Sequence, residues 1–361
     1  MSGAPHTFIV MKIAAHGRRV RAFWGGQPFY WREAALCAPA MPLLLLAGVA
    51  FGQVPYAAVA TGAAFSVGFG AARDLRGRRW AAMGAATVGV ALAACVGCLA
   101  GQWLWIILPL AAVAAMGCAV LALVDEDLWW IVLQMVIALL VASYFAGPPH
   151  AALLRGGIVL AGAAVQAAVV VVLARLFPAA AARLPPGPAK DPPPRWLYPV
   201  HALRAGVCVA LSLYLAHQLG LSNGYWAPMT AMLVLKPGLT DTNTRGLARL
   251  TGTIAGGALA TLFAIAMGYA WPALVLGISV AATAAFALQK AHYAILSSAI
   301  TATVVLLLSL AEGGGALINA EHRLIATVIG GAVALVVARI APHRPAPAAA
   351  TADTVGAAVL P

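Results

Sequence analysis

The feature that most constrains this chain is a series of uninterrupted apolar runs, most of them close to 20 residues long. A bilayer core of ~30 Å needs about 20 helical residues for each crossing. Only 9% of the residues are charged, whereas a soluble domain is typically about one-quarter charged. The runs are continuous rather than alternating, which excludes a transmembrane β-barrel. We therefore predict an all-α polytopic membrane protein.

Glycines, prolines and charged clusters divide the apolar sequence into twelve candidate helices. Six lie in a first membrane half, residues 34–177, at about 34–51, 55–72, 80–100, 103–123, 128–146 and 155–177. Six lie in a second half, residues 200–340, at about 200–219, 224–239, 247–268, 271–288, 293–310 and 322–340. The remaining segments are a basic N-terminal segment (1–33), a Pro-rich linker (178–199) and an Ala/Pro-rich tail (341–361), which we expect to be disordered.

The distribution of basic residues predicts the orientation of these helices. Lys12, Arg18 and Arg19 place the N-terminus in the cytoplasm, because cytoplasmic segments carry the excess of Lys and Arg. With twelve spans, all of the 22 Lys and Arg residues except Arg155 and Arg323 then lie on the cytoplasmic side. Both termini and the linker are therefore predicted to be cytoplasmic. The net charge of +12 is explained by this orientation, and we expect no nucleic-acid partner.

An internal repeat divides the chain further. Residues from Arg249 and from Arg323 both read R-L-x-x-T-[IV]-x-G-G-A, and each string opens a candidate span. Weaker echoes begin at Arg155, which has Val159 in the threonine position, and at Arg79, which keeps only the arginine. Successive copies enter the membrane from opposite sides. This pattern predicts two parallel six-helix halves, each an inverted 3+3 repeat, as in many secondary transporters.

The repeat supplies the main candidate site residues. Arg249 and Thr253 share one helical face, as do Arg323 and Thr327. One interpretation is a path with a cationic entrance at each membrane surface, where guanidinium groups capture carboxylates. The alternative is that the small residues permit close helix packing and the arginines reach the interface as anchors. The external position of Arg323 favours a functional role, since it opposes the positive-inside bias.

Further candidates lie on the short span at 224–239. Lys236 precedes Pro237 and could hold an anion beside a kinked helix, or could anchor a helix end. Tyr225 and Trp226 could stack on an aromatic substrate or belong to an interfacial aromatic belt. Thr230 could line a path or bond between helices. Arg155 and Arg79 complete the substrate-binding candidates.

The segment Gly224-Tyr225-Trp226 to Asp241-Thr242, followed by Arg245, Arg249 and Gly252-Thr253, resembles the FUSC family of fusaric acid resistance proteins and aromatic acid exporters. The resemblance covers about residues 200–340 well and residues 30–177 weakly. It implies a bacterial inner-membrane, multi-pass protein that exports aromatic carboxylic acids or similar organic anions. Its expected partners are the lipid bilayer and a small organic anion, while a homo-oligomer and a periplasmic adaptor stay open.

Missing motifs narrow the function further. No lysine lies in a P-loop, and H-E-x-x-H and G-x-S-x-G are absent, so we expect neither an ATPase nor another enzyme. The histidines and the five cysteines have no metal-ligand spacing, and we expect no metal and no cofactor. A secondary transporter is the leading hypothesis. A passive anion channel and a non-transporting component of an envelope complex are the alternatives.

Overall fold

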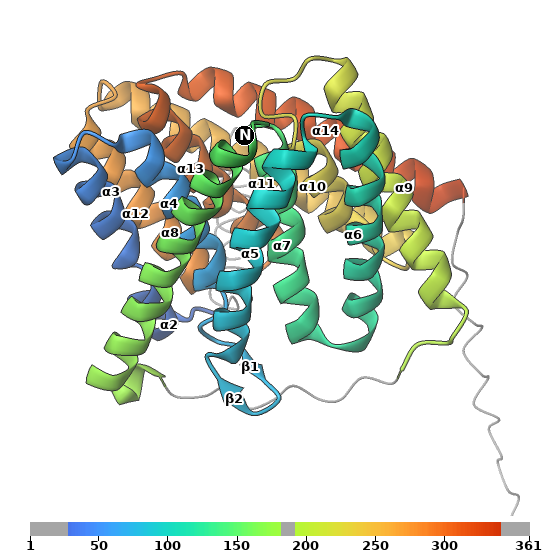
Figure 1. Cartoon of the computed structure of the whole chain (residues 1–361), viewed down its shortest axis with the longest axis horizontal. Coiled ribbons are helices and arrows are strands. Elements are labelled where there is room, and N and C mark those ends of the chain that lie inside the picture. The colour runs from blue at the N-terminus through green and yellow to red at the C-terminus, as the bar shows by residue number, and fades with distance from the viewer. Residues whose placement is uncertain (1–27, 182–191, 341–361) are drawn as a thin grey trace, which may run out of the picture.

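The computed structural model describes residues 28–181 and 192–340, which are almost entirely helical (Figure 1). The helices of the first half are α2 (Trp31–Cys37), α3 (Ala40–Ala50), α4 (Val54–Gly68), α5 (Ala81–Ala100), α6 (Leu104–Val124), α7 (Glu126–Ser143) and α8 (Pro149–Leu176), and a 3₁₀ turn follows at Pro178–Ala181. Those of the second half are α9 (Leu197–Gln218), α10 (Trp226–Val234), α11 (Leu239–Ala266), α12 (Trp271–Ala287), α13 (Tyr293–Glu312) and α14 (Ala316–Ile340). A two-stranded hairpin, β1 (Asp74–Leu75) and β2 (Arg78–Arg79), precedes α5.

Each of the twelve predicted runs is helical over most of its length, but not all of them are long helices. Among the described residues, nine helices are long and apolar enough to cross a membrane, counting Trp31–Ala50 as one. Val54–Gly68 and Trp271–Ala287 are shorter apolar helices, and α10 has only nine residues. The fold is thus that of a polytopic helical membrane protein, and twelve complete spans stay a prediction. Residues 1–27, 182–191 and 341–361, which include most of the basic segment, half of the linker and the tail, lie outside the described residues.

The junction between α10 and α11 differs from the prediction. A span over 224–239 followed by a turn at Asp241–Thr242 is wrong, because α10 ends at Val234 and Asp241 lies in the first turn of α11. Pro237 cannot continue a helix, since it lacks the backbone donor and clashes with the preceding turn. The Thr242 hydroxyl bridges the break by accepting from the Lys236 N–H (3.0 Å) and donating to the Gly238 carbonyl (2.8 Å).

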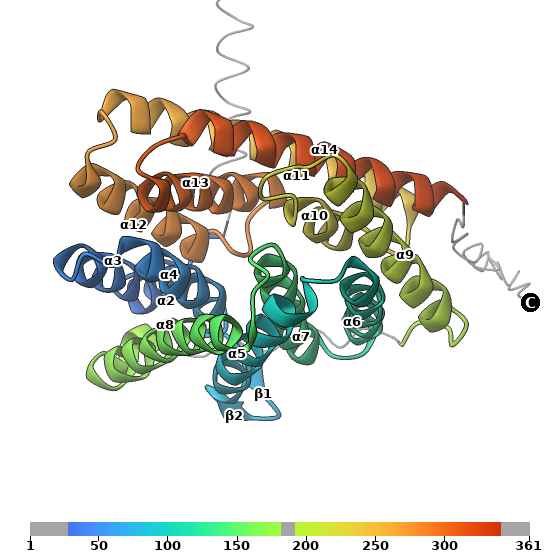
Figure 2. The ribbon, with the colours of Figure 1, turned by 45° about the horizontal axis from the view of Figure 1, so that its top comes forward.

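The two halves pack their helices in the same pairs. In the first half α5 packs on α7 and α8, α4 on α8, α6 on α7 and α3 on α4. In the second half α11 packs on α13 and α14, α10 on α14, α12 on α13 and α9 on α10. Figure 2 shows α11, α13 and α14 running side by side across the view, above α3, α4 and α8. The repeated pairing supports an internal duplication, while the inverted orientation within each half stays a prediction.

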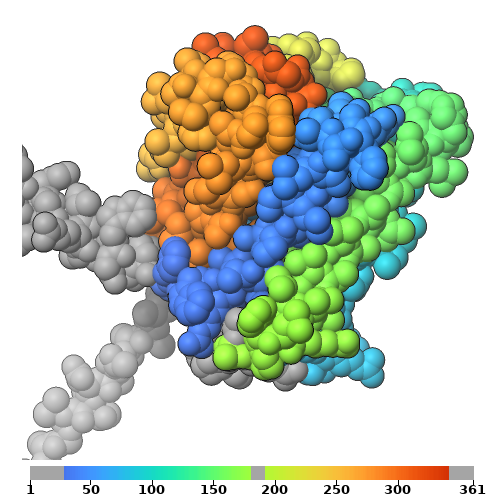
Figure 3. All heavy atoms as spheres, turned by 90° about the vertical axis from the view of Figure 1, so that its left-hand side faces the viewer, coloured from blue at the N-terminus to red at the C-terminus, as the bar shows by residue number. Residues whose placement is uncertain are grey.

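Contacts between the halves are reciprocal as well. Helix α6 packs on α9, and its counterpart α12 packs on α2 and α3. Likewise α7 contacts α10 while α13 contacts α4. In Figure 3 helices α2 to α4 lie between α8 and the helices of the second half. An approximate two-fold axis that relates the two halves would produce these reciprocal contacts.

Glycines permit these pairings, and four of them are compared between the two halves. At each one, an added Cβ would overlap a carbonyl oxygen of the partner helix, so only glycine allows the approach. The four are Gly97 on α5, Gly162 on α8, Gly256 on α11 and Gly330 on α14, and the carbonyls belong to Leu139 on α7, Ala60 on α4, Ser298 on α13 and Ala227 on α10. Each of the last three lies seven residues after the arginine of its repeat string. These three glycines of the repeat therefore serve helix packing.

The position of Gly97 shows that one predicted copy of the repeat, at Arg79, is misplaced. In the other copies the arginine lies seven residues before the corresponding glycine, and seven residues before Gly97 is Val90, a buried residue of α5. Arg79 is therefore out of register with the other arginines. It lies on strand β2, and its guanidinium group stacks over Trp80 at 4.4 Å from the ring centroid. The prediction that Arg79 is a fourth copy of the repeat arginine is wrong.

We predict that Gly330→Ala destabilises the protein whereas Gly331→Ala does not. The new methyl group at residue 330 would meet the Ala227 carbonyl, while the position beside Gly331 is open. Overpacking of this kind costs about 1–3 kcal/mol. Thermal unfolding of the two purified variants in the same detergent measures the difference. Equal unfolding midpoints would contradict the packing role of Gly330.

The predicted orientation is testable by cysteine labelling, because four of the five native cysteines are buried and only Cys95 is partly exposed. Gln53 lies in the α3–α4 turn, and Lys290 lies in the α12–α13 turn; both are exposed. We expect Gln53→Cys to react with a membrane-impermeant maleimide in intact cells, and Lys290→Cys to react only after permeabilisation. The opposite pattern would invert the topology.

Candidate functional site

The candidate site lies inside the second half, where α10, α11, α13 and α14 meet. Arg249 on α11 and Arg323 on α14 are only 2% and 1% exposed. The Arg249 Nη1 atom donates to the Ser297 hydroxyl at 3.4 Å, and the Arg323 Nε atom donates to the Thr301 hydroxyl at 3.1 Å. Ser297 and Thr301 are one turn apart on α13, so the two guanidinium groups lie close enough to interact electrostatically.

This arrangement corrects the predicted pair of entrances at opposite membrane surfaces. Helix α11 begins at Leu239 and α14 at Ala316, so Arg249 and Arg323 lie about 15 Å and about 10 Å inside their helices at a rise of 1.5 Å per residue. Because the two helices pack on each other and on α13, both arginines project into one interior region. They form a single buried cationic cluster.

Among the described residues, no carboxylate forms an ion pair with Arg249 or Arg323. The ion pairs of this part of the chain include those of Arg73 with Glu126 and Asp127, and of Lys290 with Glu126. Arg249 Nε and both terminal nitrogens of Arg323 have no hydrogen-bond partner in the described segments 28–181 and 192–340. Burying an unpaired cation costs several kcal/mol. An unpaired and incompletely bonded pair of guanidinium groups is thus complementary to an anion.

Aromatic rings border the cluster on the side of Arg323. Its guanidinium carbon lies 3.6 Å from the Trp226 ring centroid, a cation–π contact that offsets part of the burial cost. Tyr225 packs on Trp226 with ring centroids 5.0 Å apart, and Tyr144 packs on Tyr225 at 5.5 Å. All three lie where α7 meets the start of α10. Tyr225 and Trp226 are buried rather than part of an exposed aromatic belt.

The three candidate threonines have different surroundings. The hydroxyl of Thr327 donates to the Arg323 carbonyl one turn earlier at 2.8 Å, which is a structural bond within α14. The hydroxyls of Thr253 and Thr230 are buried and have no hydrogen-bond partner in the part of the chain that the structure describes. Thr253 lies one turn beyond Arg249, and Thr230 lies against Gly330. These two threonines can offer further hydrogen bonds to a ligand.

The other predicted candidates lie apart from the cluster. Arg155 is half-buried on α8, stacks over Phe145 at 4.2 Å, and is within electrostatic range of Tyr225. Lys236 lies beyond the opposite end of α10, with its ammonium group 5.9 Å from the Trp129 ring centroid. Arg79 lies on the hairpin that precedes α5, away from α10 and α14 in Figures 1 and 2.

Sequence reasoning missed several residues of the second half. Ser297 and Thr301 supply the hydroxyls that hold the two arginines, and their signal is a series of small hydroxyl residues in an otherwise apolar helix. Tyr293 lies under the Arg245 guanidinium group at 3.8 Å, and its own hydroxyl has no partner. Arg204 and His201 are buried on α9, although they precede the apolar part of that helix.

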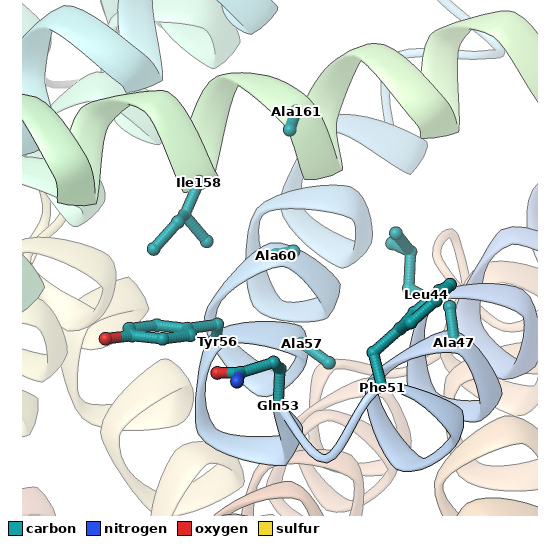
Figure 4. Close-up of a pocket in the computed structure, with 10 residues that line it drawn as sticks. Leu44, Ala47, Phe51, Gln53, Tyr56, Ala57, Ala60, Ile158 and Ala161 are labelled. Atoms are coloured by element: carbon teal, nitrogen blue, oxygen red, sulfur yellow. The ribbon is translucent and has the colours of Figure 1, made fainter.

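A separate pocket lies on the outside of the first half. It is formed by α3, α4 and α8 and is lined by Leu44, Phe51 and Tyr56, among others (Figure 4). Gln53 and Tyr56 supply its polar groups, and no arginine or lysine lines it. It is an open, apolar groove that suits a lipid chain better than an anion, and it contains none of the candidate site residues.

Comparison with known proteins concerns the second half. Residues 208–337 match the family model described as fusaric acid resistance protein-like. No curated protein and no solved structure matches the chain. The match confirms the predicted resemblance to the FUSC family over the segment that holds Arg249 and Arg323. It points to a membrane transporter-like role rather than to an enzyme.

We predict that benzoate binds to the cluster and stabilises the purified protein. A ligand at 100 times its dissociation constant stabilises the folded state by about 2.7 kcal/mol. We expect benzoate to raise the unfolding temperature of the wild type and of Arg339→Gln, which removes an exposed charge on the same helix. Arg323→Gln should remove the effect. An equal rise in all three proteins would place binding elsewhere.

Proposed function

We propose that the protein is a bacterial inner-membrane secondary transporter that exports organic anions, among them aromatic carboxylic acids. The observation that carries this proposal is the pair of buried arginines, Arg249 and Arg323, which have unused N–H donors and no carboxylate partner among the described residues. The matched family model supports the transport role. The substrate class rests on the chemistry of the cluster.

The cluster offers both groups that an aromatic carboxylate needs. Guanidinium groups bind carboxylates through paired, charge-assisted hydrogen bonds. The row of Tyr144, Tyr225 and Trp226 adjoins Arg323, and aromatic rings favour offset or edge-to-face partners. A substrate that places its carboxylate on the arginines can therefore place its ring against this row.

The burial of the arginines favours a carrier over the alternative of a passive channel. Side chains that are 1–2% exposed are separated from both membrane surfaces, so an anion reaches them only after helices move. In secondary transporters such movement of one repeat against another exposes the site alternately to each side. An inside-negative potential supplies ~2.3 kcal/mol per 100 mV for each exported negative charge, so the potential or the proton gradient can drive export.

The test is efflux of labelled benzoate and a panel of other aromatic acids from cells with matched amounts of protein at the surface. We expect export in the wild type, and loss of at least about tenfold in the double variant Arg249→Ala plus Arg323→Ala, as expected for the loss of charge-assisted bonds worth more than 1.4 kcal/mol. Separate dissipation of the proton gradient and the potential identifies the driving force.

The matched control is the double variant Arg175→Ala plus Arg339→Ala, which removes two exposed arginines from the ends of α8 and α14. It should export normally. Flux that is unaffected by the cluster variants would contradict the proposal. Single-channel conductance in a planar bilayer would favour the channel, and normal flux in a deletion strain with loss of a co-purifying protein would favour a non-transporting component.

A further inference from the structure

A second group of basic side chains lies beyond the other end of α10. Arg204 and His201, on the first turns of α9, are 3% and 5% exposed. The Arg204 Nη1 atom donates to the Pro237 carbonyl at 3.0 Å, but its Nε and Nη2 atoms have no partner. The Nδ1 atom of His201 is also buried and has none.

Lys236 adds a third basic side chain to this region. It is within electrostatic range of His201, and it lies near Trp129 of α7. Among the described residues, Arg204 is in none of the ion pairs, which include those of Arg73 and Lys290. Two basic side chains are thus buried together with unused polar atoms, and a third lies beside them.

A purely structural role for Arg204 accounts for only part of this arrangement. Its bond to Pro237 closes the break between α10 and α11, and Arg245 closes the same region by donating to the Leu233 carbonyl at 2.9 Å. A guanidinium group has five N–H donors in a planar fork, and one bond leaves the others in a dry environment. Those remaining donors and His201 Nδ1 require a partner that the described residues do not supply.

We propose that Arg204, His201 and Lys236 form a second binding site for a small organic carboxylate. The site is separate from the Arg249–Arg323 cluster, since the nine residues of α10 span about 13 Å at 1.5 Å per residue. It lies on the side that the charge bias predicts to be cytoplasmic. As part of a transport path, which rests on the proposed function, it is the site that an exported anion reaches first.

Two tryptophans allow the sites to be observed separately. Trp226 contacts Arg323, and Trp129 lies beside Lys236. The probe is 4-bromobenzoate, whose bromine quenches nearby indole fluorescence, added to the purified full-length protein in detergent. Comparison of the wild type with Trp129→Phe and with Trp226→Phe assigns a component of the quenching to each tryptophan.

We expect Arg204→Gln to weaken the Trp129 component about tenfold, the effect of losing one charge-assisted bond, and to leave the Trp226 component unchanged. His201→Leu should weaken the same component without touching the bond to Pro237. Arg204→Lys should restore part of it. Arg195→Gln, which removes an exposed charge just before α9, is the matched control and should bind like the wild type.

Three results would overturn the second site. The first is an unchanged Trp129 component in Arg204→Gln and His201→Leu. The second is parallel loss of both components in Arg204→Gln, which would assign Arg204 a structural role at the α10–α11 break. The third is loss of both components in Arg323→Gln, which would indicate one site only. Failure of benzoate export with the Trp129 component retained would reject the proposed transport function but keep the site.

Discussion

Close backbone contact between helices at glycine is the constraint on which the rest of this structure depends. In a bilayer the helices gain little from burying apolar surface against each other, so association depends on van der Waals packing and on backbones that approach closely. Gly256 and Gly330 bring α11 against α13 and α14 against α10. These two contacts fix which residues face the shared interior. Arg249 and Arg323 lie seven residues before their glycines, two turns along the same helical face, and are therefore held in that interior.

The first half has the helix packing of the second half but lacks the buried polar side chains of the arginine cluster. Gly97 meets Leu139 as Gly256 meets Ser298, and both pairs are displaced by the same number of residues (256 − 97 and 298 − 139 are both 159). With this displacement Arg249 corresponds to Val90, and Ser297 and Thr301 correspond to Ala138 and Ala142. The same helix pairing is present in both halves, while these polar groups are present only in the second. Arg155 is the exception, and it lies near Tyr225 of the second half.

Much of the fold could be predicted from the sequence, because an apolar run identifies the part of a helix that lipid and protein surround. An apolar run does not show where the helix begins or ends. The run that begins near residue 247 is preceded by Asp241, Thr242 and Arg245, which lowered the hydropathy although α11 already begins at Leu239. The sequence therefore predicts that Arg249 lies at a membrane surface, whereas the structure places it several turns inside α11. Which side chains meet across helices, such as Arg323 with Thr301, depends on tertiary packing that a single sequence does not encode locally.

The position of α10 connects the two cationic regions in physical terms. This helix is short and buried, with Trp226 and Arg323 at its start and Pro237 and Arg204 just beyond its end. In the proposed transport path an anion would be stabilised at either end, and the apolar helix between them would be a barrier because a lone charge is poorly solvated there. Two attractive sites separated by such a barrier would hold an anion without binding it irreversibly at one place. Passage would then require that the pairing of α10 with α14 and α9 loosens. The glycine contact between Gly330 and Ala227 is where such a movement would be opposed, so helix packing and anion passage act on the same contact.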